Sequence, residues 1–203
     1  MGERRDRSAA PRFVLASGSP RRRELLKEAG YAFDLVLPTV DEVFAEWLTV
    51  REITACNAMR KAIAAAQTAP NAVVLGADTL VSLDGRVMGK PVDLADAART
   101  LQRLSGRSHE VWTSVFVCHL ATKQVRSFQE ISHVIFRELD ENAIANYLSK
   151  IDPLDKAGAY AAQGHGVEII EAIEGSYTNV VGLPMERTKK VLRAFGVASR
   201  AKD

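Results

Sequence analysis

The chain has 203 residues, of which 47% are hydrophobic and 26% are charged. This composition is ordinary for a folded domain with one sizeable core, or one core with two lobes. The formal net charge of +2 is too mild to indicate a nucleic-acid polymer as a partner, so any anion-binding site must be local. No apolar run approaches the ~20 residues that span a membrane.

The cysteines and the two ends of the chain predict a protein of the reducing cytoplasm. Cys56 and Cys118 lie far apart in apolar contexts, with no CxxC pair, and are expected to be small buried hydrophobes. Residues 1–11 and 198–203 are polar and aperiodic, and we expect tails there rather than targeting signals. The remaining residues, 12–197, are expected to form a single domain.

The first elements in chain order are a strand and a well-marked helix. Phe13–Ala16 is a short apolar strand, and Ser19 followed by Pro20 is a typical helix start. The helix is expected to end at Gly30. The pattern then predicts an extended segment over 33–40, a helix over 50–67, and a strand buried on both faces over 72–77.

The second half of the chain alternates between strands and helices. Asp84-Gly85 predicts a hairpin with a primed turn between strands 80–83 and 86–88. Further on, we expect a helix over 95–104, two long antiparallel strands over 110–120 and 125–137, a helix over 140–148, strands over 167–173 and 177–181, and a closing helix over 185–195. The fold class is therefore α/β with a mixed sheet, bent into two lobes around a cleft.

The corner between the first strand and the first helix is a candidate phosphate site. Free N–H groups at a helix N-terminus attract phosphate, Ser17 and Ser19 add hydroxyl donors, and arginine forks match phosphate oxygens. The alternative is a surface helix with a serine cap and solvated arginines at 21–23. The corner is not a P-loop, because GxxxxGK[ST] is absent, and no GxGxxG follows a strand.

Two further stretches carry candidate chemistry. Asp78 is expected where a buried strand ends, and ligands bind at the carboxyl ends of strands in α/β sheets, although a turn or cap residue is the alternative. Lys90 in the GKP bend either aims its amine at the same cleft or lies in solvent. In residues 152–166, Asp155, Lys156 and Gln163 stand among small residues that let the backbone approach a ligand.

The amide of Gln163 suits the edge of a nucleobase, with a structural loop as the alternative. The acidic pair Asp41–Glu42 is by default a surface loop, but would hold Mg²⁺ if it faces Asp78, because Mg²⁺ uses one or two carboxylates with phosphate oxygens and water. The four histidines show no metal-ligand spacing such as HExxH.

Seven collinear blocks resemble the Maf family of nucleoside triphosphate pyrophosphatases. They are LASGSPRR at 15–22, AMRKA at 58–62, LGADTLV at 75–81, GKP at 89–91, LSGRSHEVWTSV at 104–115, DKAGAY at 155–160 and YTNVVGLP at 177–184. The resemblance implies an ITPase-like fold, in which helices flank an elongated sheet and a cleft divides two lobes. It also implies hydrolysis of a nucleoside triphosphate to the monophosphate and pyrophosphate with a divalent metal (Mg²⁺ or Mn²⁺), and it favours a homodimer.

The resemblance also implies roles for individual residues. Asp78 matches the family's proton acceptor, and Arg21, Thr79 and Gln163 match positions associated with substrate choice. The resemblance places Lys61 and Lys90 in the family's phosphate-binding set. The residues themselves add Ser17, Ser19, Arg22 and Lys156 as expected substrate-binding groups, and Asp41, Glu42 and Asp78 as expected metal ligands. Arg23 has no such support and is expected in solvent.

The subfamily follows from the residues around these motifs. GADT together with a glutamine before glycine resembles the branch that acts on dTTP and UTP, whereas the branch that acts on 7-methyl-GTP has a glutamate where Gln163 stands. Ala161 and Ala162 depart from the usual AYGIQG form and alter the expected pocket wall. The alternatives are 7-methyl-GTP or another non-canonical nucleotide as substrate, or a non-catalytic nucleotide-binding regulator linked to cell division.

Overall fold

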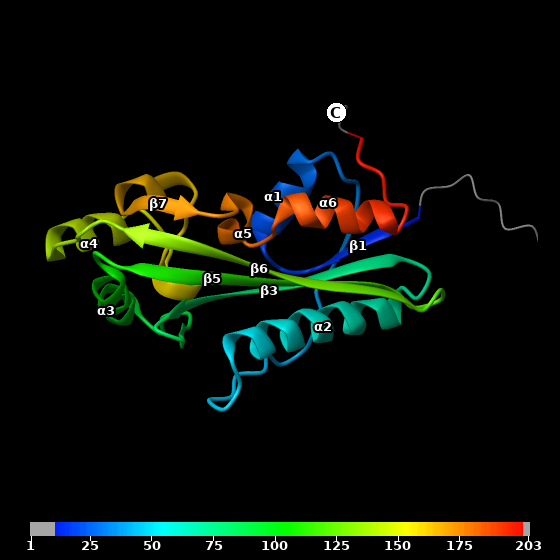
Figure 1. Ribbon diagram of the computed structural model, residues 1–203, viewed down its shortest axis with the longest axis horizontal. Coiled ribbons are helices and arrows are strands. Elements are labelled where there is room, and N and C mark those ends of the chain that lie inside the picture. Colours follow the sequence, from blue (N-terminus) through cyan, green and yellow to red (C-terminus); the bar gives the residue numbers. More distant parts are fainter. Residues whose placement is uncertain (1–10, 201–203) are drawn as a thin grey trace, which may run out of the picture.

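The computed structural model describes residues 11–200, and its central feature is a mixed β-sheet (Figure 1). Across the described residues the strand order is β2 (Asp34–Val36), β1 (Phe13–Ala16), β3 (Val73–Leu83), β5 (Ser108–His119), β6 (Gln124–Phe136) and β7 (Ile170–Glu174), with β4 (Arg86–Met88) paired to β3. Strand β1 runs parallel to β2 and β3, and the other pairings are antiparallel. The predicted α/β class and the long antiparallel pair β5–β6 are confirmed.

Helices cover both faces of this sheet. They are α1 (Pro20–Glu28), α2 (Val50–Thr68), α3 (Leu94–Leu104), α4 (Glu141–Leu148), α5 (Tyr177–Val181) and α6 (Met185–Ala194), with short 3-10 turns η1 (Ala157–Ala159) and η2 (Gly164–Glu168). In Figure 1, α2 lies along one face of the sheet, and α1, α5 and α6 lie on the other. Among the described residues, no helix combines the length and apolar character needed to cross a membrane.

Local capping explains where several of these elements begin. The Ser19 hydroxyl accepts the backbone N–H of Arg22 at 3.4 Å, and Pro20 occupies the first turn of α1. Helix α2 begins with a reciprocal capping box between Thr49 and Glu52. The turn between β3 and β4 places Asp84 at φ 51° and Gly85 at φ 75°, which is the predicted primed turn. The predicted start of α1 and the predicted hairpin turn are confirmed, because each depends on neighbours within four residues.

Strand β3 runs through both halves of the molecule and connects their cores. Its first half packs on two apolar clusters, one on each face: Val73 and Leu75 join α1 and α6, and Val74 joins α2. Its last residues, Val81 and Leu83, belong to a separate cluster with α3 and α4. The core therefore divides into two parts along the strand, as a two-lobed arrangement requires.

The sheet edge beside the middle of β3 is open. Strand β1 pairs with residues 73–76 of β3, and β4 pairs with residues 81–83 on the same side. Residues 77–80 lie between these two partners and pair only with β5 among the described residues. The prediction that Asp78 follows the end of a strand is therefore wrong, because β3 continues through it. The strand that ends here is β1.

Two further predictions about elements are corrected by the structure. Residues 177–181 form helix α5 rather than a strand, because the Ser176 hydroxyl caps the backbone N–H of Asn179 at 3.2 Å and Gly182, at φ 126°, ends the helix. The strand expected from residue 167 begins only at Ile170, since the preceding residues form η2. The tails predicted for 1–11 and 198–203 fall largely outside the described residues. Arg200 lies within them, and its N–H donates to the Gly30 carbonyl at 2.8 Å.

Candidate active site

A cleft of about 670 Å³ opens at the uncovered edge of β3. This volume is within the range of small-molecule sites. The cleft is lined by all ten candidate substrate and catalytic residues: Ser17, Ser19, Arg21, Arg22, Lys61, Asp78, Thr79, Lys90, Lys156 and Gln163. Of the acidic pair, Glu42 lines the cleft and Asp41 does not.

Helix α2 reaches the site because it lies unusually close to β3. At Gly76, an added Cβ would stand 2.5 Å from the carbonyl oxygen of Ala58 and 2.7 Å from the amide nitrogen of Ala62. Only glycine allows this approach, since no side-chain carbon fits in that space. Alternate residues of a strand share a face, so Gly76 and Asp78 both point to α2. The result is that Lys61, on the adjoining turn of α2, meets Asp78.

Asp78, Lys61 and Glu42, together with Asn57, form a group that we call the Asp78 cluster. The Lys61 ammonium donates to Asp78 Oδ1 at 2.7 Å and to Glu42 Oε1 at 2.6 Å. The Asn57 amide donates to Asp78 Oδ2 at 3.2 Å. Asp78 is only 6% exposed, and a carboxylate that is this buried needs such partners. Two carboxylates therefore share one ammonium at the floor of the cleft.

Glu42 is an ionised member of this cluster. Partial burial by itself raises the pKa of Glu42, but the hydrogen bond and charge of Lys61 outweigh it, with Lys90 and Arg22 adding to the effect. The pKa of Glu42 is therefore held below its ordinary value. At neutral pH this carboxylate is charged and faces the same ammonium as Asp78.

Arg22 joins three elements beneath the cleft. Its buried guanidinium donates to the Gly182 carbonyl at 2.8 Å, to Ser17 Oγ at 3.3 Å and to Thr79 Oγ1 at 3.0 Å. Burial lowers the pKa of Arg22, and the negative charge of Asp78 opposes this change. The contacts fix the β1–α1 corner against β3 and the end of α5. Arg22 therefore holds the wall of the cleft as well as lining it.

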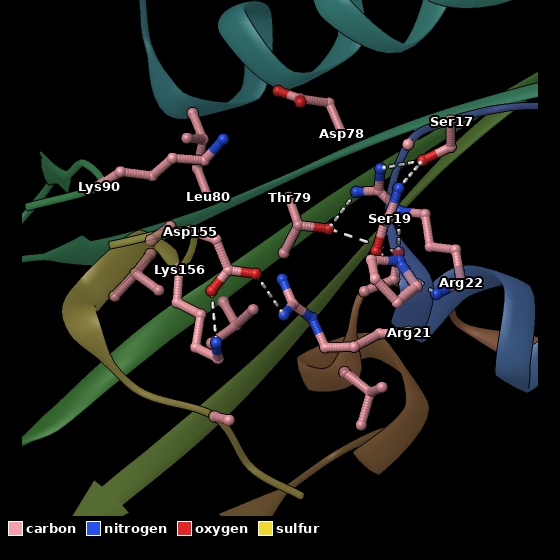
Figure 2. Close-up of a pocket in the computed structure, with 18 of the residues that line it drawn as sticks. Ser17, Ser19, Arg21, Arg22, Asp78, Thr79, Leu80, Lys90, Asp155 and Lys156 are labelled. Carbon is pink, nitrogen blue, oxygen red and sulfur yellow. Dashed lines mark hydrogen bonds and ion pairs between the residues drawn. The ribbon is translucent and has the colours of Figure 1, made fainter. Parts of the chain in front are cut away.

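Arg21, Asp155 and Lys156 form a second group, the Arg21 cluster, on the opposite side of the cleft (Figure 2). The Arg21 guanidinium contacts Asp155 Oδ2 at 3.2 Å, and the Lys156 ammonium is paired with the other oxygen of the same carboxylate. Lys156 also donates to the Asp152 carbonyl at 2.6 Å. These ion pairs lower the pKa of Asp155, even though its partial burial acts to raise it. One carboxylate thus pairs with two cations, and the Arg21 cluster keeps a net positive charge.

Lys90 and Gln163 line the cleft, and their side chains make no hydrogen bond or close ion pair to another described residue. Figure 2 shows the Lys90 side chain pointing toward the side of the cleft where Asp78 lies. Gln163 precedes η2 and lines the cleft, and its side-chain amide makes no hydrogen bond to another described residue. An ammonium and an amide are therefore left available for a ligand.

With this geometry in place, comparison with known proteins identifies the family. The family model described as "Maf-like protein" matches residues 12–195. The chain belongs to the Maf family.

Relatives of this Maf-family chain cover nearly its whole length. It is 46% identical over 184 residues to the dTTP/UTP pyrophosphatase of Pelotomaculum thermopropionicum, covering 91% of this chain and 96% of the relative. It is 43% identical over 184 residues to the protein of the same name from Bacillus cytotoxicus, covering 91% and 95%. It is 41% identical over 186 residues to that of Bacillus anthracis, covering 92% and 96%. Among solved structures, the Staphylococcus aureus Ham1 protein matches with a TM-score of 0.42 and 17% identity, covering 63% of this chain and 72% of that one.

Motif reasoning in this Maf-family chain missed two contacts that shape the site. Asn57 lies outside every motif block, yet it bonds Asp78. Asp155 was expected as a possible ligand group, but its observed partners are Arg21 and Lys156. The signal available for Asn57 was its spacing of four residues from Lys61, which puts both side chains on one face of α2. Nothing local indicated the pairing of Arg21 with a residue 134 positions away.

Proposed function

We propose that this Maf-family chain hydrolyses nucleoside triphosphates, dTTP and UTP in particular, to the monophosphate and pyrophosphate. The observation that carries the proposal is a buried carboxylate, Asp78, in a cleft that is lined by five cationic side chains and by two more exposed carboxylates, Glu42 and Asp155. The relatives that are 41–46% identical over most of the chain carry the name dTTP/UTP pyrophosphatase. Their name supports the choice of substrate.

The reaction joins water to the α-phosphorus and breaks the bond from that phosphorus to the oxygen bridging to the β-phosphate. Asp78 accepts the proton of the attacking water, and pyrophosphate leaves with the bridging oxygen. Lys61 and Asn57 hold the two carboxylate oxygens in place. Negative charge that builds on the phosphoryl oxygens needs cations positioned in advance. Arg21, Lys90 and the N-terminus of α1 supply them.

A divalent cation is part of this proposal. Glu42 and Asp78 lie on either side of the Lys61 ammonium, so the site already places positive charge between two carboxylates. These oxygens fit Mg²⁺ or Mn²⁺ with phosphate oxygens and water as the remaining ligands. The described residues contain no group of three or more metal-ligating side chains. The cation would therefore be held mainly by substrate, and it would supply charge neutralisation of the phosphates.

Gln163 is the residue that we propose reads the base. Its unpaired amide lines the cleft beside Ala161 and Ala162, and an amide both donates and accepts, as a pyrimidine edge requires. A homodimer and a cytoplasmic location stay predictions from the family resemblance and the cysteine usage.

The proposal is tested by pyrophosphate release from a panel of nucleoside triphosphates, each with and without Mg²⁺ or Mn²⁺. We expect dTTP and UTP to be hydrolysed fastest, and only with metal. Faster hydrolysis of 7-methyl-GTP or another modified nucleotide would overturn the base preference but keep the reaction. Binding of nucleotide with no pyrophosphate release under any condition would favour a regulator instead.

A further inference from the structure

Asn57 is a buried polar residue whose whole side-chain amide is used at the site. It is 3% exposed, and it makes three hydrogen bonds. The Val43 N–H donates to Asn57 Oδ1 at 2.7 Å, while Asn57 Nδ2 donates to the Val43 carbonyl at 3.1 Å and to Asp78 Oδ2 at 3.2 Å. Asn57 does not line the cleft. It contacts the catalytic carboxylate from behind.

The orientation of this amide is dictated by its partners. A backbone N–H can only donate, so the amide oxygen of Asn57 must face the Val43 nitrogen. The amide nitrogen then faces the Val43 carbonyl and the Asp78 carboxylate, and both of these only accept. Each group of the amide therefore has a complementary partner, and the reversed amide would leave at least two contacts unsatisfied.

These contacts close a ring that includes both carboxylates of the cleft. Asn57 and Lys61 stand four residues apart on α2, and they hold Oδ2 and Oδ1 of Asp78 respectively. Lys61 also binds Glu42, and Glu42 adjoins Val43 in the chain. The loop between β2 and α2 is thus attached to Asp78 by two routes, one through an amide and one through an ammonium.

We propose that Asn57 is a positioning residue, which sets the direction of the Asp78 carboxylate and ties the Val43 segment to it. The inference rests on the proposed function, because it concerns the residue that activates water there. A carboxylate that lost its Oδ2 partner would turn about its side-chain bonds toward Lys61. Displacement of a catalytic group by about 1 Å lowers turnover by up to about 10²-fold. Substrate binding changes little, since Asn57 does not face the cleft.

Two substitutions separate the hydrogen bonds from the shape of the side chain. Asn57→Leu keeps a similar volume but removes all three hydrogen bonds. Asn57→Asp keeps the shape, removes both donors and adds a negative charge beside Asp78. We expect kcat for UTP to fall about tenfold or more in Asn57→Leu and further in Asn57→Asp, with KM changed less than about threefold.

Hydrogen exchange at the Val43 amide gives a second readout that does not depend on turnover. Asn57→Leu removes the oxygen that accepts the Val43 N–H, so we expect this amide to exchange faster than in the unchanged chain. Asn57→Asp keeps an acceptor oxygen at this place, so we expect a smaller change there. The amides at the start of α2 keep their protection, because the Thr49–Glu52 capping box is untouched. The matched control is Thr54→Val, on the same helix, whose hydroxyl contacts Ser114 and neither Asp78 nor Val43.

The outcomes are distinct. Unchanged kcat in both Asn57 variants would overturn the positioning role. An equal fall in kcat in Thr54→Val, at the same loss of thermal stability, would also overturn it. A rise in KM without a change in kcat would also overturn it. If the unchanged chain releases no pyrophosphate from any nucleotide, the proposed function fails, and the positioning role of Asn57 in catalysis fails with it. Hydrogen exchange at the Val43 amide then still shows whether Asn57 holds the Val43 segment in place.

Discussion

The two sides of the cleft are built in different ways. Three members of the Asp78 cluster, Asn57, Lys61 and Asp78, stand on a helix and a strand that touch through a glycine, and the Lys61 and Asp78 side chains are 13% and 8% exposed. The fourth member, Glu42, comes from the loop before α2, and its side chain is 53% exposed. The Arg21 cluster stands on a helix start and a loop, and its Arg21 and Asp155 side chains are 27% and 49% exposed. Buried groups on packed elements keep one geometry, whereas half-exposed ion pairs exchange partners readily. Under the proposed function, we therefore expect the chemistry on the first side of the cleft and substrate capture on the second.

Loss of the Asp78 carboxylate is expected to have the largest effect. Asp78→Asn keeps the shape and leaves Lys61 paired with Glu42, but removes the base, so turnover of dTTP and UTP should fall by about 10²-fold or more. Nucleotide binding, followed by calorimetry, should persist. The control is Asp84→Asn, because Asp84 is an exposed turn residue that pairs with Arg107. Full activity of Asp78→Asn would show that chemistry does not reside on this side.

Removal of Arg21 should weaken capture more than chemistry. Phosphate oxygens can replace Asp155 as the partner of its guanidinium, and a hydrogen bond to a charged group contributes about 1.5–3 kcal/mol. Arg21→Ala is therefore expected to raise KM for UTP about tenfold or more, with a smaller change in kcat. Arg23→Ala, two positions along the same helix, serves as the control and should leave KM unchanged. An equal effect of the two variants would contradict the division of roles.

The smallest expected effect is a pH dependence of the free energy of unfolding. It concerns residues that support the side of the cleft where the Arg21 cluster lies. His109 Nε2 meets the hydroxyl of Tyr160 at 2.8 Å, and Tyr160 lines the cleft. Burial lowers the pKa of His109 to about 4. The unfolded chain takes up this proton with an ordinary pKa of about 6.5, so the folded state loses stability as pH falls from about 6.5 toward 4.

The slope from this one group is at most about 1.4 kcal/mol per pH unit. Urea unfolding at pH 7 and pH 5 measures it. We expect His109→Phe to lose less stability over this interval than the unchanged chain, while His133→Gln, at an exposed position, behaves like the unchanged chain. The same loss in all three proteins would assign the acid sensitivity to other groups.

Sequence patterns predicted correctly those features of this protein whose interacting residues lie close together along the chain. Ser19 and Pro20 at the start of α1 and Asp84-Gly85 in the hairpin were predicted correctly, because each signal acts within one turn of chain. Residues 177–181 were wrongly predicted as a strand, since a segment of five residues is assigned by its cap and by its packing rather than by its pattern. Asp78 was expected in the cleft and lies there, but the reason given for it was wrong, because β3 continues through Asp78 and the strand that ends beside it is β1.

By itself, the sequence determined the α/β class, the start of α1, the β3–β4 turn, the family blocks, and ten polar side chains that line the cleft. Tertiary structure decided how those side chains are joined. Gly76 brings α2 onto β3 closely enough for Asn57 and Lys61 to hold Asp78, and the gap between β1 and β4 opens the sheet edge at the same place. The physical reason is that caps, turns and alternation arise from hydrogen bonds and sterics between near neighbours. Partners that lie 21 or 134 positions apart meet only when the whole sheet is packed.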